Sequence, residues 1–365
     1  MTRGIDRFFL GIIIVLLAVG ILVFLSAAMG VLAKNASKFY NILFNQLVLG
    51  LLGGLLLMYL TSRINYKFWR KYSFWFFFSS ILLTVLVFVP GLGLRHGGAL
   101  RWVSLGPVSF QPVEFLKIGF LIYFAGWLAW VKSKVENFRF GILPFVLLIG
   151  VVAVILLKQP DTKNFVLIVI GALAMFLLSG VKWRHIFWIG LGLAVLLGGL
   201  FFTQPYLKER LKTYLDPSRD PTGSSYQIQQ SLIGIGSGGI FGRGYGQSVQ
   251  KFSFLPEPQG DSIFAVIGEE FGFVGSAIIV ILYVIFGWRG LWIANRAPDI
   301  FSRLLVTGIV ILITAQAFLN IASAIAVFPL TGVPLPLISH GGTSLFMTLG
   351  ALGIVLNISK YCRRI

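Results

Sequence analysis

Long apolar runs separated by short polar breaks follow one another along almost the whole chain. An apolar run of about 18 residues or more is long enough to cross the hydrocarbon core of a bilayer as a helix. The pattern predicts an all-α polytopic membrane protein of about ten transmembrane helices, forming one domain over residues 1–365. The predicted spans are 8–32, 40–60, 73–90, 113–131, 140–157, 164–180, 186–206, 262–287, 304–327 and 343–358.

The composition supports a membrane protein and excludes other classes. Charged residues make up 12% of the chain, against about 25% in a soluble domain. The net charge of +18 comes from basic residues spread between apolar spans, as membrane flanks require, so no nucleic-acid partner is expected. Cys362 is the single cysteine and the three histidines lie in separate segments, so neither a disulfide nor a metal site is predicted.

The polar breaks between the apolar runs are alternately rich and poor in Lys and Arg, and this alternation predicts the orientation in the membrane. One set of breaks holds 17 Lys and Arg residues and the alternate set holds 6, leaving out the long segment 207–261. Lys and Arg accumulate on the cytoplasmic side, so both termini are expected in the cytoplasm. The first apolar run exceeds the usual core of a signal peptide, which favours a retained helix.

Segment 207–261 is then a large extracytoplasmic loop between helices 7 and 8. Loops of more than about 15 residues are usually functional or disordered. Its many apolar residues favour a segment that folds back onto the membrane surface. Together with the 91–112 loop and the Pro/Gly-rich stretch 328–342, it is expected to surround one site on the outer face.

Two carboxylate motifs stand out near that face. Glu114 and Lys117 are spaced i, i+3, so they share a helix face and can pair; such a pair inside a membrane is either a structural clamp or part of a functional site. Asp261 precedes an apolar helix, where it could be the N-cap or a general base whose pKa partial desolvation raises. Glu257 is a second candidate base.

The glycine-rich segment 234–246 has no βαβ context, so a nucleotide fingerprint is not indicated. Its glycines would allow tight turns against the membrane or against a sugar–phosphate headgroup. Arg243 and Lys251 nearby could contact phosphate or be ordinary solvated charges. Glu269 and Glu270 point about 100° apart on a helix, so they are expected to be structural.

Three segments carry a family resemblance that extends over nearly the whole chain. They are RWVSLGP and FQPVEFLK in 101–117; DP, YQIQQS, FLPEPQGDSIFA and GEE in 216–270; and Asn320 with PLTGVPLPLISHGGTS in 329–344. Together they resemble the SEDS family of bacterial shape, elongation, division and sporulation proteins, whose branches are FtsW, RodA and SpoVE. Residues 247–251 are more similar to the FtsW branch than to the RodA branch.

The resemblance implies a peptidoglycan glycosyltransferase of the bacterial cell membrane. Such an enzyme polymerises lipid II, an undecaprenyl-pyrophosphate disaccharide-pentapeptide, on the outer face, in cell division or in cell elongation. Its implied partners are a class B penicillin-binding transpeptidase and other division or elongation membrane proteins. The alternatives are a flippase that carries lipid II across the bilayer and a non-enzymatic scaffold.

The resemblance also implies roles for individual residues. Asp261 matches the essential outer-loop aspartate and is expected to be the base of an inverting transfer. Glu114 and Lys117 match the family's buried pair, and Trp102 matches its cavity-facing tryptophan. Beyond the resemblance, Lys117, Arg101, Arg243 and Lys251 are expected to stabilise the pyrophosphate charge. The full set of expected substrate-binding residues is Trp102, Arg101, Glu114, Lys117, Glu257, Arg243, Lys251 and Ser339. No cofactor is certain; a divalent cation, Mg²⁺ or Mn²⁺, could assist at the pyrophosphate, but the sequence shows no ligand set for it.

The chain departs from the family pattern at several positions. His340 replaces the usual aromatic residue before Gly-Gly, and it could make activity pH-dependent because imidazole titrates near neutrality. Residues 162–164 read Thr-Lys-Asn where Leu-Gly-Thr is usual, Gln259-Gly260 stands where His-Thr is frequent, and Ala326 stands where glycine is common.

Overall fold

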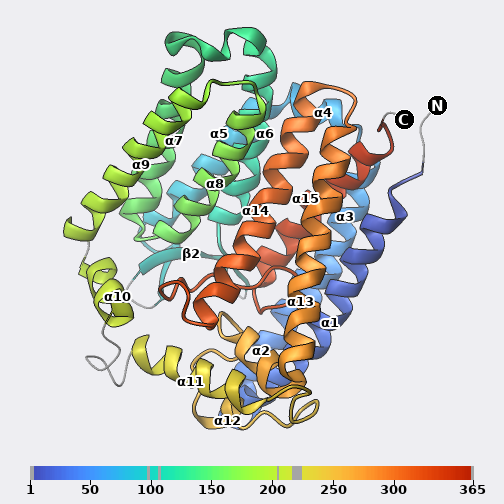
Figure 1. Ribbon diagram of the computed structural model, residues 1–365, viewed down its shortest axis with the longest axis vertical. Coiled ribbons are helices and arrows are strands. Elements are labelled where there is room, and N and C mark those ends of the chain that lie inside the picture. The colour runs from blue at the N-terminus through green and yellow to red at the C-terminus, as the bar shows by residue number, and fades with distance from the viewer. Residues whose placement is uncertain (1–3, 97–98, 106–107, 204, 216–223, 363–365) are drawn as a thin grey trace.

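The computed structural model describes residues 4–96, 99–105, 108–203, 205–215 and 224–362. Within these ranges, seven helices are long and apolar enough to cross a membrane (Figure 1). They are α1 (Arg7–Leu32), the continuous helix Ala36–Arg63, α6 (Val113–Val131), the continuous helix Phe138–Lys158, α13 (Ile263–Asn295), α14 (Ile300–Ala324) and α15 (Gly342–Ser359). The chain is therefore a multi-pass membrane protein, as predicted.

Shorter elements complete the bundle. Each of the ten predicted ranges overlaps one long helix or one of three shorter apolar helices over most of its length. These three are α5 (Ser73–Val85), which continues as η2 (Leu86–Phe88), α8 (Thr162–Leu178) and α9 (Trp183–Thr203), of which the shorter part Trp183–Leu196 is the apolar stretch. The helix Ala36–Arg63 consists of α2 (Ala36–Phe44), the π-helical η1 (Asn45–Leu52) and α3 (Gly53–Arg63), and the helix Phe138–Lys158 consists of η4 (Phe138–Ile142) and α7 (Leu143–Lys158).

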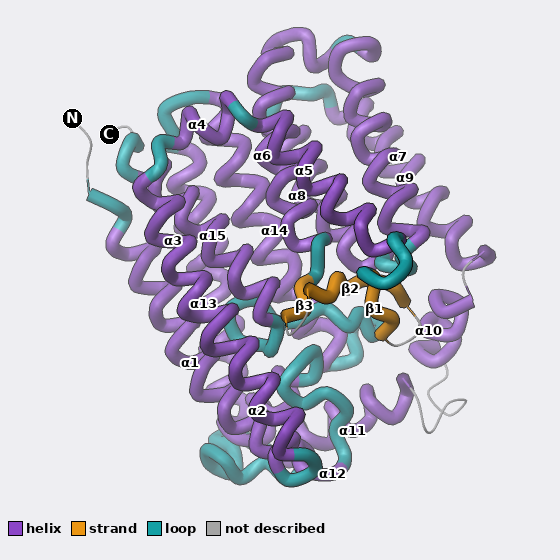
Figure 2. Tube along the Cα trace, turned by 180° about the vertical axis from the view of Figure 1, so that it is seen from behind, coloured by secondary structure: helices purple, strands orange, loops and turns teal. Residues whose placement is uncertain are grey.

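The two ends of the bundle differ. Both termini lie at the end that carries α4 (Tyr66–Lys71), and the sheet and the helices of segment 207–261 lie toward the other end (Figures 1 and 2). The basic turn η3 (Lys132–Glu136) precedes η4. Segment 207–261 is largely helical, with α10 (Pro205–Leu215), α11 (Ser224–Ser237) and α12 (Gln250–Ser253); its motif at Asp216 and Pro217 lies outside the described residues.

Helices α6, α14 and α15 are the most buried spans. The outer helices keep apolar side chains on the surface, which a bilayer would cover. The loop between α14 and α15 enters this core, because Leu335, Leu337 and Ile338 are buried. The loop therefore belongs to the packed interior and can hold a polar site in a fixed position.

The 91–112 loop contains a three-stranded antiparallel sheet that the sequence did not predict, while the spans are all helical as expected. Its strands, in the order β1-β2-β3, are β1 (Gly93–His96), β2 (Ala99–Leu105) and β3 (Val108–Phe110). Trp102 pairs with Leu94, and Val103 pairs with both Gly93 and Phe110. The register shifts between Leu94 and Arg95, because Arg95 pairs with Leu100, and Arg101 is therefore the extra residue of β2 at a bulge.

Helix α13 is interrupted at Gly272, whose φ of 66° and ψ of −162° are not helical. The break frees backbone carbonyls that a continuous helix would use, and the glycine-rich segment binds there. The amides of Arg243 and Gly244 donate to the carbonyls of Glu269 and Glu270 at 3.0 Å each. A β-carbon at Gly272 would lie 2.3 Å from the Gly242 nitrogen. These glycines therefore serve close backbone packing.

Candidate active site

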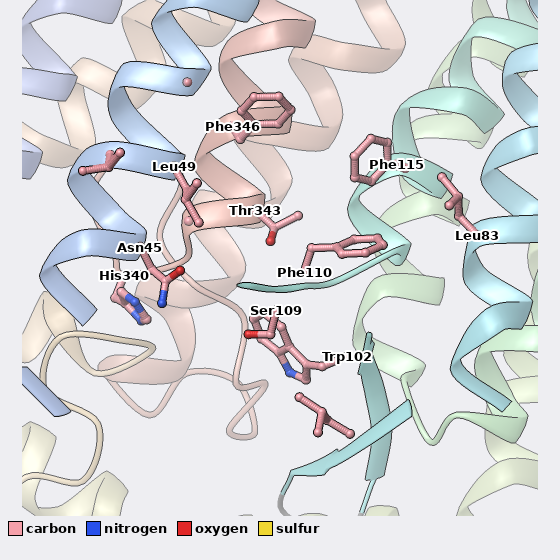
Figure 3. A pocket seen from close by; sticks show the side chains of 14 residues that line it. Asn45, Leu49, Leu83, Trp102, Ser109, Phe110, Phe115, His340, Thr343 and Phe346 are labelled. Carbon is pink, nitrogen blue, oxygen red and sulfur yellow. The ribbon is translucent and has the colours of Figure 1, made fainter. Parts of the chain in front are cut away.

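A pocket of about 650 Å³ opens between η1, the sheet and α15 (Figure 3). One part of its wall is polar, with Asn45, Ser109 and Thr343, and another part is apolar, with Phe110 and Phe346. Trp102 also lines it, as the resemblance implies for a cavity-facing tryptophan. Such a mixed wall suits an amphiphilic ligand that is partly lipid and partly polar.

Asp261 lies just before the N-terminal end of α13 but does not cap it. The N-cap is Ser262, and no side chain provides a capping hydrogen bond there. The Gln227 amide donates to Asp261 Oδ1 at 3.3 Å, and the Asn320 amide donates to the Asp261 carbonyl at 2.8 Å. The N-cap alternative is therefore wrong, and the carboxylate is available for another role.

Basic side chains from distant segments gather around this carboxylate. A β-carbon on Gly332 would lie 3.4 Å from Asp261 Oδ2, 3.7 Å from Lys163 Nζ and 3.8 Å from Arg210 Nη2. Lys163 donates to the Gly332 carbonyl, and Arg210 Nη1 donates to the Leu330 and Thr331 carbonyls at 3.0 and 3.2 Å. The positive φ of 64° at Gly332 favours glycine.

Arg101 extends this group from the sheet. Its guanidinium donates to the carbonyl of Gln159, at 3.3 Å, and to that of Pro160, just before the helix that carries Lys163, and its charge acts on Lys163. We call Asp261, Lys163, Arg210 and Arg101 the Asp261 cluster. Two cations near the carboxylate, with Arg101 near one of them, suit a substrate that carries several negative charges.

Burial raises the pKa of Asp261 above its ordinary value, Lys163 lowers it, and Glu257 raises it again. The net result is a raised pKa, which makes this carboxylate a stronger base than an exposed aspartate. Glu257, the second candidate base, is solvent-exposed and accepts a 2.9 Å hydrogen bond from Gln259. Its position fits an electrostatic influence on Asp261 better than a role as the base.

The buried pair Glu114–Lys117 connects to this cluster through α14. The two charges are 2.8 Å apart and their side chains are almost fully buried. Lys117 donates to Gln316 at 3.3 Å, and Gln316 donates to the Pro334 carbonyl at 3.0 Å. The pair therefore supports the loop that presents Gly332, and it does not line the described pocket.

Ser339 also holds the loop between α14 and α15 in position. It is buried, and its hydroxyl accepts from the Leu335 amide at 2.8 Å. Its carbonyl accepts from Gln46 at 3.1 Å. These contacts tie the loop to itself and to η1, so Ser339 shapes the wall rather than presenting its hydroxyl to a substrate.

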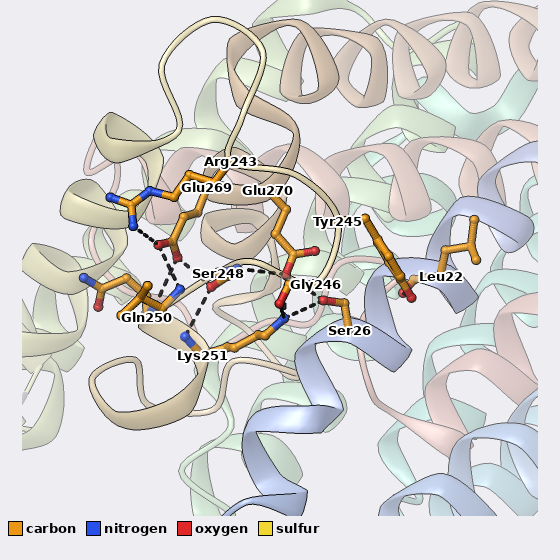
Figure 4. Close-up of polar contacts among 11 residues, drawn as sticks. Leu22, Ser26, Arg243, Tyr245, Gly246, Ser248, Gln250, Lys251, Glu269 and Glu270 are labelled. Carbon is orange, nitrogen blue, oxygen red and sulfur yellow. Dashed lines mark hydrogen bonds and ion pairs between the residues drawn. The ribbon is translucent and has the colours of Figure 1, made fainter.

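Arg243 and Lys251, predicted to contact phosphate, have other partners (Figure 4). Lys251 is 1% exposed, and its ammonium uses its three donors on Glu270 at 2.7 Å, Ser26 at 2.8 Å and the Gly246 carbonyl at 2.8 Å. Arg243 lies 3.5 Å from Glu269. The substrate-binding prediction is wrong for Lys251 and finds no support for Arg243, because both charges anchor the loop to α13.

His340 also differs from expectation. Burial, with a smaller contribution from Lys38, lowers its pKa from 6.5 to about 4, and the ring stacks on Phe24 with centroids 6.1 Å apart. The imidazole is therefore neutral at neutral pH. The predicted pH dependence from His340 is wrong, and the side chain acts as an aromatic residue in the pocket wall.

Comparison with known proteins identifies the family. The chain matches the FtsW/RodA/SpoVE profile, described as a cell cycle protein, over residues 6–364. It is 38% identical to stage V sporulation protein E of Bacillus subtilis (strain 168) over 85% of each chain. It is also 35% identical to a probable peptidoglycan glycosyltransferase FtsW of Geobacter sp. (strain M18), covering 99% of this chain and 98% of that protein.

This chain belongs to the FtsW/RodA/SpoVE family. Solved structures agree: a chain of a peptidoglycan synthase complex, described as coordinating polymerization and crosslinking, matches with a TM-score of 0.81 and 28% identity, covering 99% of both chains. Thermus thermophilus RodA matches with a TM-score of 0.71 and 28% identity, covering 99% of this chain and 98% of that one. In this FtsW/RodA/SpoVE protein, Lys163 and Arg210 are the site residues that the sequence did not single out.

Proposed function

We propose that the protein is a lipid II polymerase, an inverting peptidoglycan glycosyltransferase with Asp261 as its general base. The observation that carries the proposal is the position of Asp261, which caps no helix and lies near Lys163 and Arg210, with Arg101 acting on Lys163. The names of its relatives, which include probable peptidoglycan glycosyltransferases, support the same reaction.

The proposed reaction is a single displacement. Asp261 accepts the proton of the acceptor sugar's 4-hydroxyl as that oxygen attacks the anomeric carbon of the donor. The new C–O bond forms on the face opposite the bond to pyrophosphate, and the pyrophosphate leaves with that bond's electron pair. The nearby cations stabilise its charge. Inversion needs one base, whereas a double displacement would need a nucleophile as well.

The lipid and polar parts of the substrate would be bound by different residues of β2. Trp102 and the pocket of Figure 3 would receive the part nearer the lipid, and Arg101 would contact the pyrophosphate. Among the described residues, no group of three or more His, Cys, Asp or Glu side chains is placed to hold a metal ion. The proposal therefore assigns no step to Mg²⁺ or Mn²⁺.

The proposal also includes the orientation of the protein in the membrane and its partners. We place both termini and α4 on the cytoplasmic side of the bacterial cell membrane, with ten spans and the Asp261 cluster on the outer face. A class B penicillin-binding transpeptidase would crosslink the strands, with other division or elongation membrane proteins nearby. The relatedness to a chain from a peptidoglycan synthase complex supports such a partner.

The proposed activity can be tested with purified lipid II. The reconstituted full-length protein, together with its transpeptidase partner, is expected to convert lipid II into long glycan strands, visible by gel electrophoresis. A parallel assay would follow movement of fluorescent lipid II across the bilayer of the same vesicles. Strands without transport support a polymerase; transport without strands would make the flippase correct, and neither would favour the scaffold.

Replacing Lys163 by Met is expected to shift the pH dependence of strand synthesis. The base must be deprotonated, so the rate falls as the pH drops through the pKa of Asp261. Lys163 lowers that pKa, so removing its charge raises the pKa and moves the acid limb to higher pH. Rates measured across the pH range would show this. Lys158→Met is the control, because it removes an exposed lysine and should leave the acid side of the pH–rate profile unchanged. An acid side that does not shift in Lys163→Met would contradict the prediction.

A further inference from the structure

A second cavity lies far from the Asp261 cluster along the helices, between α7 and α9. These two helices lie side by side at one edge of the molecule (Figures 1 and 2). The groove between them has a volume of about 550 Å³ and an almost wholly apolar lining, including Phe145, Ile149, Trp188 and Leu193. Empty apolar space of this size does not persist inside a bilayer, so a hydrocarbon group must fill it.

Glycines give the groove its width. Gly150 of α7 and Gly192 of α9 both line it, and a β-carbon added to either would meet no atom within 4 Å. Both positions therefore face open space, unlike Gly290 in α13, where a β-carbon would lie 2.5 Å from a Val310 methyl carbon. The small residues here leave room for a ligand and do not serve close helix packing.

The groove is polar and basic only at one end. His185 lines that end, and its Nδ1 is buried without a hydrogen-bond partner among the described residues. The exposed Arg184 and Arg139 lie next to the lining residues His185 and Phe138. Lys182 pairs with Glu136 at 2.8 Å and links η3 to the start of α9 across this end.

We propose that the groove binds an anionic diacyl phospholipid of the cytoplasmic leaflet. One acyl chain would occupy the space beside Gly150 and Gly192, and the headgroup phosphate would lie at His185, Arg184 and Arg139. Basic sites between helices on the cytoplasmic side suit anionic headgroups, because that leaflet is negatively charged. The orientation rests on the proposed function; the groove and its basic end do not.

Such a lipid would influence the position of Arg210 in the Asp261 cluster, because the helix that carries Arg210 follows α9 in the chain. Helix α9 ends at Thr203, and α10, which begins at Pro205, carries Arg210. Arg210 binds the Leu330 and Thr331 carbonyls beside Gly332. A filled groove would hold α9 against α7 and thereby fix the direction in which α10 approaches the cluster.

The binding test uses the full-length protein in mild detergent with palmitoyl-oleoyl phosphatidylglycerol or phosphatidylcholine, and counts retained lipids by native mass spectrometry. Wild type is expected to retain phosphatidylglycerol preferentially. Gly192→Leu places a side chain where at least two methylenes would lie and should weaken retention about tenfold. Gly190→Leu is the matched control, since it makes the same change on α9 in open space outside the groove.

Two further variants keep the test decisive. Gly150→Leu fills the groove from α7 and serves if Gly192→Leu does not fold. Arg184→Gln should reduce the preference for phosphatidylglycerol about fivefold and leave total retention of lipid largely intact. The proposal would be overturned if Gly192→Leu and Gly150→Leu retained as much lipid as Gly190→Leu. It would also be overturned if wild type retained both lipids equally.

An activity measurement separates this proposal from the proposed function. Strand synthesis by wild type and Gly190→Leu should be faster in phosphatidylglycerol vesicles than in phosphatidylcholine vesicles, and Gly192→Leu should lose that difference. A difference that Gly192→Leu keeps would overturn the link from α9 to Arg210. If lipid retention follows expectation and no variant makes strands, the proposed function fails and the lipid site stands.

Discussion

Asp261→Asn is expected to reduce strand synthesis from lipid II by about 10²–10⁴-fold, the usual contribution of general-base catalysis. Asparagine keeps the size of the side chain, and its carbonyl oxygen can still accept the hydrogen bond from Gln227. Because Asp261 does not cap α13, no helix cap is lost. The variant therefore removes the proton acceptor and leaves the fold unchanged, and initial rates with purified lipid II would measure the loss.

Glu257→Gln is the matched control for this prediction. It removes a carboxylate four residues earlier in the same loop, but an exposed one, and should keep most of the activity. Identical elution profiles in detergent would show that all three proteins are folded. Full activity of Asp261→Asn would refute the assignment of the base, and loss of activity in Glu257→Gln alone would transfer the role to Glu257.

Lys117→Met should destabilise the protein by about 3–5 kcal/mol, because it leaves Glu114 charged and unpaired in a buried position. The same change removes the hydrogen bond that Lys117 donates to Gln316. Gln316 in turn donates to the Pro334 carbonyl. The expected result is a lower midpoint of thermal unfolding in detergent, together with reduced strand synthesis. The stability effect does not depend on the proposed reaction.

The double variant Glu114→Met with Lys117→Met distinguishes pairing from other causes. Removing both charges together should restore most of the lost stability, since replacing a buried ion pair by apolar residues is often neutral. Strand synthesis should remain low in the double variant if the pair positions the Gly332 loop. A double variant as unstable as the single one would show that the lost stability comes from packing alone.

The membrane helices and the contact between Glu114 and Lys117 could be predicted from the sequence, because both depend on spacing along the chain. Apolar runs located the helices because span length is set by the bilayer, and the i, i+3 spacing predicted the contact between Glu114 and Lys117. The small sheet was missed because its strands are only 3 to 7 residues long, too short to show a clear alternating pattern. Asp261 stood out by its place before an apolar helix, the family resemblance favoured a general base over an N-cap, and the structure shows that it caps no helix.

The rest of the site depends on contacts between distant segments. Lys163 begins α8 and Arg210 lies on α10, and only the folded loop around Gly332 brings them to Asp261. Lys163 was noted in the sequence only as a departure from the family pattern. Lys251 was misassigned for the same reason, because its partner Glu270 comes 19 residues later and folds back on it.

The irregular register at Arg101 restricts how this segment can change in evolution. Trp102 pairs with Leu94 and Leu100 pairs with Arg95, so Arg101 is the extra residue of β2 at a bulge. This extra residue donates to the Gln159 and Pro160 carbonyls, while its neighbour Trp102 lines the pocket of Figure 3. Deleting one residue of β2 ahead of Trp102 would restore regular pairing and remove the bulge that presents the guanidinium. Length changes within β2 should therefore be selected against even where the sheet itself could still form.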